Sequence, residues 1–578
     1  MKNINEKTKE LGSLYRELYA AAKEAHGEYF SELEKYMRQY LGSTEIDGSY
    51  ESAVTVRNIT YELIESQVNA DIPYPKADAI GSNDRSRECA KSIERLCYAI
   101  RDQLPFEEMN DLDERYTYIY GGSVFYVEWD SECTSLGGAG GVKIHCLSPL
   151  DFIPQPGISD IESMQYCFLR FTTTKSELKR RYGATDEEIS LAECEFKYGE
   201  AGTDDDTVTL IHAFYRDEDG VIGKLEFSGD LLLAAIPDYY VRKEAVCAYC
   251  GESAEDCRCD ERKLELINTP TESLIAAELG IDAGGEIAVD YYTPSSFPIV
   301  IRKNTSSNHS LFGLSDCERI RPEQQAINKI ESRILKKLLR SGVTPVIPED
   351  ASIQPSNAIF GEVIRMRPGE SLDNYGKIDT TPDISQDIEE ANRLYDHAKR
   401  ILGITDALQG TDQTRFESGY ARQLKISQAS SRLESKRRMK YHAYSRIFRL
   451  IFELYLAFAD EPRDLVYRDG FGAPRHSIFN RYDFLYLSPD GYAYNDSFHF
   501  SVDLNNGGEY TRETVWERNL ANLESGTLGD KSDPHTLLLY WRAQERANYP
   551  YARDNAEHFE EMIRSKANEI STAPKNPI

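Results

Sequence analysis

Four cysteines close together in the middle of the chain carry the clearest chemistry in the sequence. Cys247 and Cys250 enclose two residues and are followed by Gly251, and a polar spacer of six residues separates Cys250 from the pair Cys257 and Cys259. A Cys-x2-Cys turn directs two thiolates to one point, and four thiolates complete the tetrahedral sphere of Zn²⁺. The cluster predicts a structural zinc site, because no coordination position remains for water or substrate. Reduced cysteines in a loop are the alternative, since one residue alone separates the second pair.

The remaining cysteines favour a reducing compartment. The chain has 11 cysteines, an odd number that does not suit a disulfide framework. Those outside the cluster lie mostly in apolar sequence, and ordinary core packing explains them. They are Cys89, Cys97, Cys133, Cys146, Cys167, Cys194 and Cys317.

A second chemical signal is a local basic excess at residues 412–440. This stretch has eight Lys or Arg against three Asp or Glu, so its net charge is +5, whereas the whole chain has −30. A basic patch on an acidic background indicates a surface that meets an anionic partner. General coating of nucleic acid is disfavoured, because that mode depends on neutralising many phosphates.

Hydrophobic periodicity predicts the elements that hold these residues in the first half of the chain. A helix followed by a glycine turn and a strand is expected across 116–129, and the glycine run 137–141 is expected at the tip of a hairpin. The first 300 residues therefore predict an α+β fold. Further helices are expected over 3–42, 56–69 and about 88–111, and further strands at 142–147, 164–172, 208–215 and 288–292.

The second half has a different pattern. Two helices, 314–340 and 383–402, enclose a module of short strands at 341–382, and one long helix is expected over 418–460. If that helix is continuous, its 43 residues span about 65 Å. A strand-and-turn region over 465–504 and a helical tail over 510–570 complete the chain, which we expect to be a multi-domain α+β protein.

Enzymatic and membrane functions find little support. No Lys-Ser/Thr follows the glycine run, no His-Glu-x-x-His or Gly-x-Ser-x-Gly is present, and the histidines are scattered. The acidic run 204–206 is the best nuclease-like feature, and a solvated loop explains it better. The N-terminus has no apolar segment of a secretory signal. The longest apolar stretch, 447–459, contains Arg449 and Glu453 and is too short to span a bilayer.

Several short phrases, taken in order, resemble the portal proteins of tailed double-stranded DNA bacteriophages. Each phrase is weak alone, but their collinear order covers nearly the whole chain. The four-cysteine insertion, at about 240–262, departs from the common pattern and puts only the local geometry in doubt. The phrases are Val56-x-Asn58 with Glu62 and Pro73-x-Pro75, residues 120–129, 147–154 and 172–183, His309-x-x-Phe312-Gly313 with Gln324-x-x-Ile327-Asn328, and Gly403 to Asp406 leading to Glu417-Ser418-Gly419.

The resemblance implies a division of the chain into the parts of a portal fold. These would be a wing (1–312), a first stem helix (313–340), a clip (341–382), a second stem helix (383–403), a tunnel loop (404–417), a long wing helix (418–460), wing strands (461–510) and a helical crown with the C-terminal tail (511–578).

The same resemblance implies the function and the partners. Such proteins form a homo-oligomeric ring, usually a dodecamer, at one capsid vertex of the virion, after assembly in the bacterial cytoplasm. The terminase large subunit pumps double-stranded DNA through the ring, and the DNA is later ejected. A head-tail adaptor, the major capsid protein and scaffolding protein are the other expected partners. No enzymatic activity and no membrane are implied. The rival interpretations are a zinc-stapled adaptor without a channel and a metal-dependent DNA-processing enzyme.

A channel that passes DNA must not grip it, because affinity rises steeply with the number of cationic contacts. Within the implied tunnel loop and the helix behind it, we expect Gln409, Gln413, Arg415 and Lys425 near DNA. For Arg415, a salt bridge to Glu417 or to a neighbouring subunit is an equal alternative.

Basic residues also mark the implied stem and the long helix. In the stem they either line the channel or form ion pairs between subunits, and the sequence leaves both open. Those of the long helix are expected to face solvent or a neighbouring subunit. The stem residues are Lys329, Arg333, Lys336, Lys337 and Arg340, and the helix residues are Lys436, Arg437, Arg438 and Lys440.

Overall fold

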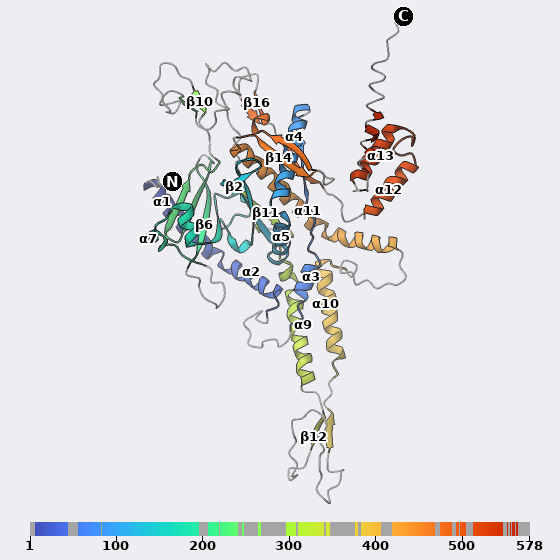
Figure 1. Cartoon of the computed structure of the whole chain (residues 1–578). Coiled ribbons are helices and arrows are strands. Elements are labelled where there is room, and N and C mark those ends of the chain that lie inside the picture. Colours follow the sequence, from blue (N-terminus) through green and yellow to red (C-terminus); the bar gives the residue numbers. More distant parts are fainter. Residues whose placement is uncertain are drawn as a thin grey trace, which may run out of the picture.

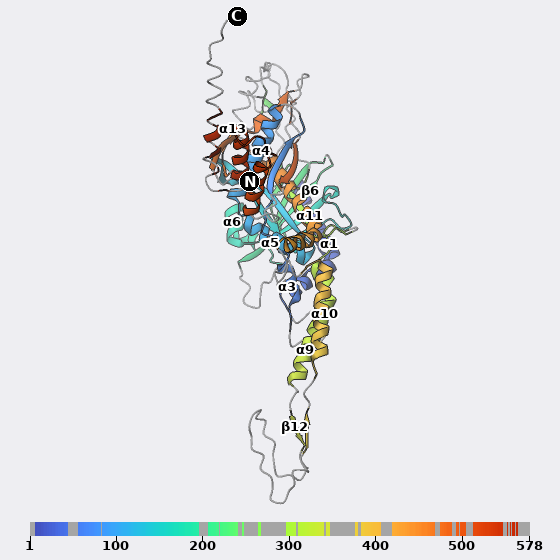
Figure 2. The ribbon, with the colours of Figure 1, turned by 90° about the vertical axis from the view of Figure 1, so that its right-hand side faces the viewer.

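The chain folds into an α+β body from which a long helical hairpin projects (Figure 1). The hairpin carries a short β-ladder at its far end (Figure 2), and a separate helical unit near the C-terminus lies beside the body (Figure 1). This computed structural model describes residues 6–43, 56–81, 84–195, 206–218, 220–240, 245–247, 264–266, 296–307, 310–339, 343–346, 376–379, 383–405, 419–459, 461–468, 474–487, 493–495, 498–503, 512–546 and short stretches between 549 and 563.

The helices follow the expected periodicity. They are α1 (Glu6–Ala25), α2 (Gly27–Tyr40), α3 (Ile59–Glu65), α4 (Asp84–Gln103), α5 (Phe106–Tyr120), α6 (Lys175–Tyr182), α7 (Asp186–Ile189), α9 (Asp316–Leu339), α10 (Ser385–Leu402), α11 (Gly419–Phe458), α12 (Arg512–Glu524) and α13 (Pro534–Arg546), with the 3-10 turns η1 (Pro149–Asp151), η2 (Ile161–Ser163) and η4 (Arg481–Phe484).

All strand pairs are antiparallel within the part that the structure describes. The strands are β1 (Tyr74–Ala79), β2 (Gly122–Ser135), β3 (Gly138–Leu147), β4 (Phe152–Pro154), β5 (Tyr166–Thr174), β6 (Thr207–Arg216), β7 (Ile222–Ser228), β8 (Leu231–Ile236), β9 (Ala245–Cys247), β10 (Leu264–Leu266), β11 (Ile299–Lys303), β12 (Val343–Val346), β13 (Gly376–Asp379), β14 (Arg463–Arg468), β15 (Pro474–Phe479), β16 (Leu485–Leu487), β17 (Ala493–Asn495) and β18 (Phe498–Asp503).

Two sheets form the centre of the body. A five-stranded sheet in the order β4-β5-β6-β7-β8 carries α1 on one face, where Tyr19 packs on Phe168 and Phe227 and Tyr15 packs on Tyr215. A three-stranded sheet in the order β11-β2-β3 packs against the C-terminal half of α11. The end of α11, residues 450–457, is buried on all sides and surrounded by the main core, whereas the preceding turns expose His442 and Arg449.

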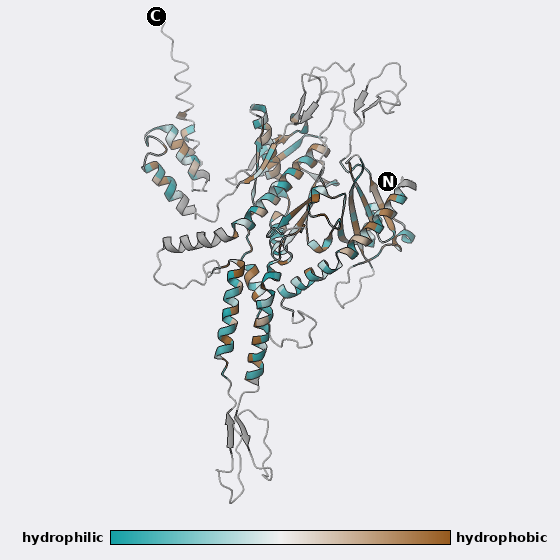
Figure 3. Cartoon of the chain, turned by 180° about the vertical axis from the view of Figure 1, so that it is seen from behind, coloured by the Kyte–Doolittle hydropathy of each residue, from teal (hydrophilic) through white to brown (hydrophobic). Residues whose placement is uncertain are grey.

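The hairpin consists of α9 and α10, which pack along an apolar seam. Ile330 and Ile334 of α9 meet Ala391 of α10 toward the far end, while Ile327 meets Ala398 nearer the body. Figure 3 shows the hydrophilic colour concentrated on the outer surfaces of both helices. The β12–β13 ladder lies beyond the far ends of α9 and α10 (Figure 1).

Gly121 joins α5 to β2 by a left-handed turn, as the sequence predicts. Its φ is +88°, and a Cβ atom there would collide with the carbonyl of Gly313. The Gly121 carbonyl accepts hydrogen bonds from the amides of Asn304 and Gly313, at 2.9 Å each. The turn therefore holds the segment that leads into α9 against the body.

The glycine run is at the tip of the β2–β3 hairpin, as predicted, and it also accommodates a buried arginine. The Arg463 guanidinium lies against Gly138 and donates to the carbonyls of Ser135 and Ala139. It also lies over the Trp129 ring. The absent side chain at Gly138 is what leaves room for this cation.

Some predicted elements differ from those observed. The helix expected over 56–69 is shorter, because it is capped by Asn58 and ends at Glu65. The helix expected over 88–111 is two helices, because Pro105 lies between α4 and α5. The strand expected at 288–292 and most of the 341–382 module lie outside the described residues. No helix in the described ranges has the length and apolar character needed to cross a membrane.

Candidate functional site at the root of the helical hairpin

A buried network of charged side chains joins the hairpin and the long helix to the body. Three cations and three anions take part, all of them 9% exposed or less. The cations are Arg302 of β11 with Lys436 and Lys440 of α11, and the anions are Asp113 and Glu114 of α5 with Asp316 of α9. We call this set the ionic junction.

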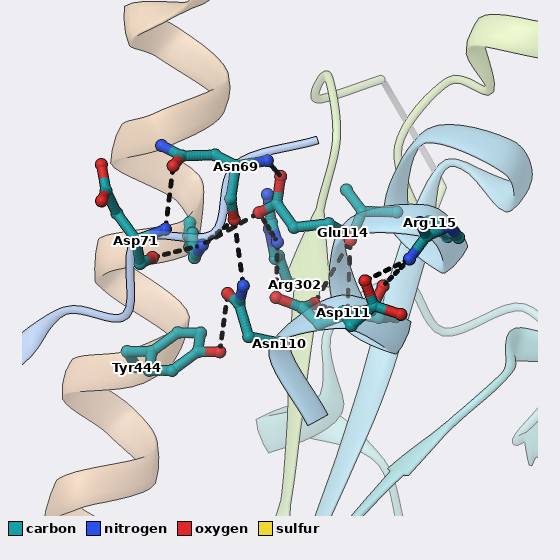
Figure 4. A network of polar contacts seen from close by, with 12 residues as sticks. Asn69, Asp71, Asn110, Asp111, Glu114, Arg115, Arg302 and Tyr444 are labelled. Atoms are coloured by element: carbon teal, nitrogen blue, oxygen red, sulfur yellow. Dashed lines mark hydrogen bonds and ion pairs between the residues drawn. The ribbon is translucent and has the colours of Figure 1, made fainter. Parts of the chain in front are cut away.

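One half of the ionic junction binds α11 to α5 and β11 (Figure 4). Arg302 Nη1 lies 2.5 Å from Asp113 Oδ2 and 2.8 Å from Glu114 Oε1. Lys440 Nζ lies 3.1 Å from the same Glu114 oxygen and donates to the carbonyl of Asp71 at 2.7 Å. A single carboxylate therefore bridges two cations from different elements.

The other half binds α11 to the first residue of the hairpin. Lys436 Nζ lies 2.6 Å from Asp316 Oδ2 and 3.0 Å from Gln67 Oε1. Asp316 also accepts from Gln67 Nε2 at 3.1 Å and from Asn304 Nδ2 at 2.8 Å. Since Asp316 begins α9, its charge also interacts favourably with the positive end of the helix dipole.

Local sequence explains how α11 supplies both lysines. Lys436 and Lys440 are four residues apart, so they lie on one side of the helix, one turn from each other. Tyr444 continues the same stripe, and its hydroxyl donates to Asn110 Oδ1 at 3.3 Å. The stripe thus changes from charged to polar to apolar as α11 enters the core.

The electrostatics of the ionic junction indicate a positioning role. Burial alone would raise the pKa of Glu114, but Arg302 and Lys440 outweigh it and lower that pKa. Burial lowers the pKa of Lys440, and Glu114 opposes the change. Each of the six charges has an opposite charge within 3.1 Å, so the network contains no unpaired acid or base. It can therefore hold elements together.

A second buried charged cluster lies between the two central sheets. Lys224 Nζ is 2.7 Å from Glu226 Oε1 and 4.0 Å from Glu128 Oε2. Tyr182 donates to Glu226 at 2.6 Å. His212 is fully buried beside Glu226, and its burial, with the nearby Lys224 charge, lowers its pKa to about 3. Burial would raise the pKa of Glu226, but Lys224 and His212 lower it to about 2.

The predicted stem residues divide into two groups. Arg333 and Lys337 each lie 2.5 Å from an oxygen of Asp387 on α10, and that carboxylate is 8% exposed beneath them. They therefore form ion pairs within the chain. Lys329 and Lys336 are exposed on α9. Arg340 lies outside the described residues.

The expectation that the basic cluster of the long helix faces solvent or a neighbour is wrong for two of its members. Lys436 and Lys440 are buried in the ionic junction. Arg438 is exposed and pairs with Glu434 of the same helix at 3.4 Å. Arg437 is half-buried.

The predicted DNA-near residues and most of the cysteine cluster lie outside the described part of the chain. This applies to Gln409, Gln413 and Arg415, while Lys425 lies within α11 with its side chain undescribed. Cys247 ends β9 and pairs with Leu264 of β10, whereas Cys250, Cys257 and Cys259 fall between these strands. Among the described residues, no group of three His, Cys, Asp or Glu side chains could hold a metal ion.

Sequence reasoning missed four members of the ionic junction, which are Asp113, Glu114, Arg302 and Asp316. A weak signal was present, because Arg302 interrupts the apolar strand Ile299–Lys303, and a charge there requires a buried partner. Adjacent acids on α5, among aromatic and apolar residues, give the complementary signal. Neither pattern identifies the partner element.

Comparison with known proteins does not assign the chain to a family. No protein-family model matches the sequence, and a search of the curated proteins finds no significant match.

Proposed function

We propose that this chain is a portal protein, which forms a ring-shaped channel for viral double-stranded DNA at one capsid vertex. The observation that carries the proposal is a projecting two-helix hairpin with a small β-ladder at its far end, rooted in an α+β body beside a long helix (Figure 1). These parts occur in the chain order that the sequence resemblance implies.

The contacts at the root of the hairpin support the proposal of a channel for DNA. A ring of hairpins that passes DNA needs each hairpin held at a fixed angle, and the ionic junction joins the first residue of α9 to α5, β11 and α11. The acidic composition also suits a conduit, because a net charge of −30 per chain disfavours tight binding of a passing polyanion.

The remaining assignments in this proposal rest on the sequence. Terminase and the head-tail adaptor meet the 341–382 module, and capsid and scaffolding proteins contact the body. Gln409, Gln413, Arg415 and Lys425 lie near DNA. A structural zinc is held by the four cysteines, and the β9–β10 pairing brings together the two ends of the segment that contains three of them.

Native mass spectrometry of the purified chain, with negative-stain images over a range of concentrations, tests the proposal. We expect a closed ring near a dodecamer, with one zinc ion per chain. A chain that stays monomeric or dimeric at high concentration, with scaffolding protein present, would contradict the channel. A ring without zinc would contradict only the metal site.

A further inference from the structure

One carboxylate of the ionic junction contacts a buried amine and a buried carboxamide together. Asp316 Oδ2 lies 2.6 Å from Lys436 Nζ and 3.1 Å from Gln67 Nε2. Lys436 Nζ also donates to Gln67 Oε1 at 3.0 Å. The three side chains therefore form a triangle in which each polar group contacts both of the others.

The triangle is largely closed to water. Asp316 is 0% exposed, Gln67 is 5% exposed and Lys436 is 9% exposed. The Tyr118 ring lies 4.9 Å from the lysine amine and covers it on one side. The other oxygen of the carboxylate, Oδ1, accepts a hydrogen bond from Asn304 Nδ2 at 2.8 Å, which fixes its orientation. The amine is therefore the nucleophile that lies nearest to the carboxamide.

The amine also lies close to the carbon that it would attack. Gln67 Cδ is about 1.2 Å from Oε1, so an ordinary hydrogen-bond angle at that oxygen places Lys436 Nζ about 3.8 Å from the carbon. Reacting atoms in a near-attack arrangement are about 3–3.5 Å apart. A small movement of the flexible lysine side chain closes this difference.

Asp316 has the contacts of a general acid and base for such an attack. An ammonium group is no nucleophile, so its proton must first pass to the carboxylate, and burial disfavours the charged forms of both groups. The same oxygen, Oδ2, contacts Gln67 Nε2, the nitrogen that must be protonated before it can leave. One carboxylate therefore reaches both nitrogens of the exchange.

We propose that Lys436 and Gln67 form an intramolecular isopeptide bond, with Asp316 as the proton carrier. A proton passes from Nζ to Oδ2, the amine attacks Gln67 Cδ, and the Nζ–Cδ bond forms as the Cδ–Nε2 bond breaks. Asp316 gives its proton to the leaving nitrogen and takes another from Nζ. The ammonium, carboxamide and carboxylate thus become a secondary amide, ammonia and a neutral carboxylic acid, and no further reactant is needed.

The bond joins two residues that are 369 positions apart in the sequence. It fixes α11 to the segment that follows α3, beside the first residue of α9, so the root of the hairpin is held covalently. Because the Tyr118 ring stabilises the ammonium form of Lys436, the neutral amine is a minor form and the bond accumulates slowly after folding. This inference goes beyond the proposed function and does not depend on it.

The mass of the full chain tests the proposal. Intact mass spectrometry of the purified protein should show the loss of one ammonia, about 17 Da, in a fraction that rises during storage of the folded protein. Trypsin does not cleave after a lysine whose amine is in an amide bond. The digest should therefore contain peptide 58–76 joined to peptide 433–437, and fragmentation should place the link on Gln67 and Lys436.

Conservative variants separate the reaction from folding. K436R keeps a cation beside Asp316, but a guanidinium stays protonated and does not attack. Q67E keeps the shape of the side chain and has no ammonia to release. Both variants should have the circular dichroism spectrum of the wild type and keep their full mass. K440R is the matched control, because Lys440 binds Glu114 and backbone carbonyls, and this variant should still form the link.

The outcomes are distinct. Folded wild-type protein that keeps its full mass after prolonged storage overturns the proposal. An ammonia loss that persists in K436R also overturns it, because the loss then arises at another site, and so does an amide between Lys436 and Asp316, which releases water. The linked peptide of the wild type supports the proposal even where a variant does not fold. None of these results depends on whether the chain forms a ring.

Discussion

Replacing Lys440 with Met should destabilise the body by breaking the ionic junction. The change removes one of the two cations that bind Glu114, although it preserves most of the side-chain volume. At the observed 3.1 Å between Lys440 Nζ and Glu114 Oε1, an effective dielectric constant of about 20 gives a gross attraction of about 5 kcal/mol. The net loss is smaller, because burying the lysine has its own desolvation cost.

The structure places the expected loss near the lower end of the range for a broken buried pair. Removing one partner of such a pair costs about 3–5 kcal/mol. Here Glu114 keeps Arg302 at 2.8 Å, while the carbonyl of Asp71 loses the Lys440 donor. We therefore expect K440M to lower the free energy of unfolding by about 3 kcal/mol.

Hydrogen exchange of the full chain provides the assay, because a protein of several parts does not unfold in a single two-state step. Opening free energies of amides in α5 and in the C-terminal half of α11 should fall together. The control R438M removes an exposed pair on the same helix, for which we expect a loss below about 1 kcal/mol. The double variant K440M/E114Q should cost less than the sum of the single variants. Equal effects of K440M and R438M would refute the reasoning.

Two other predictions concern the body. Gly138→Ala places a methyl group against the Arg463 guanidinium and should lower the stability of the body by about 1–3 kcal/mol; thermal unfolding measures the loss, and an unchanged midpoint would contradict the packing described. His212 takes up a proton near pH 6.5 when unfolded but only near pH 3 when folded, so acid favours the unfolded state between these values, by up to about 1.4 kcal/mol per pH unit. Glu226, with a folded pKa of about 2 against an ordinary 4.5, acts in the same direction at lower pH. Urea unfolding at several pH values should show a shallower pH dependence for H212Q than for the wild type, and parallel profiles would count against this account.

The long periodic helices could be predicted from the sequence, because their signal is local. Turns between them were predicted where a glycine or proline had one clear role, as at Gly121. The split at Pro105 was missed although the proline is visible, because the apolar pattern continues across it.

The ionic junction could not be predicted, because its contacts join distant parts of the chain. Lys436 and Asp316 are 120 residues apart in sequence, and the helix pattern around Lys436 is also typical of a solvated surface. The same limit applies to Gly138, whose neighbour Arg463 belongs to a strand more than 300 residues later. A charged residue in an apolar segment, or a glycine, indicates that the position has a special contact. Only the tertiary fold identifies the residue on the other side of that contact.

The long helix α11 has a mechanical consequence. Its C-terminal half is embedded in the core, its N-terminal part extends beyond the body in Figure 1, and Lys440 and Lys436 bind it where it emerges. It therefore behaves as a beam that is held at one end. About 25 Å of helix, from Gly419 to Lys436, projects beyond the two lysines that hold it, and Lys436 and Lys440 are about 6 Å apart along the helix axis. A transverse load at the projecting end would be multiplied about fivefold at Lys436, the outer of the two contacts. Because Lys436 binds Asp316, the first residue of α9, the hairpin would bear that load directly.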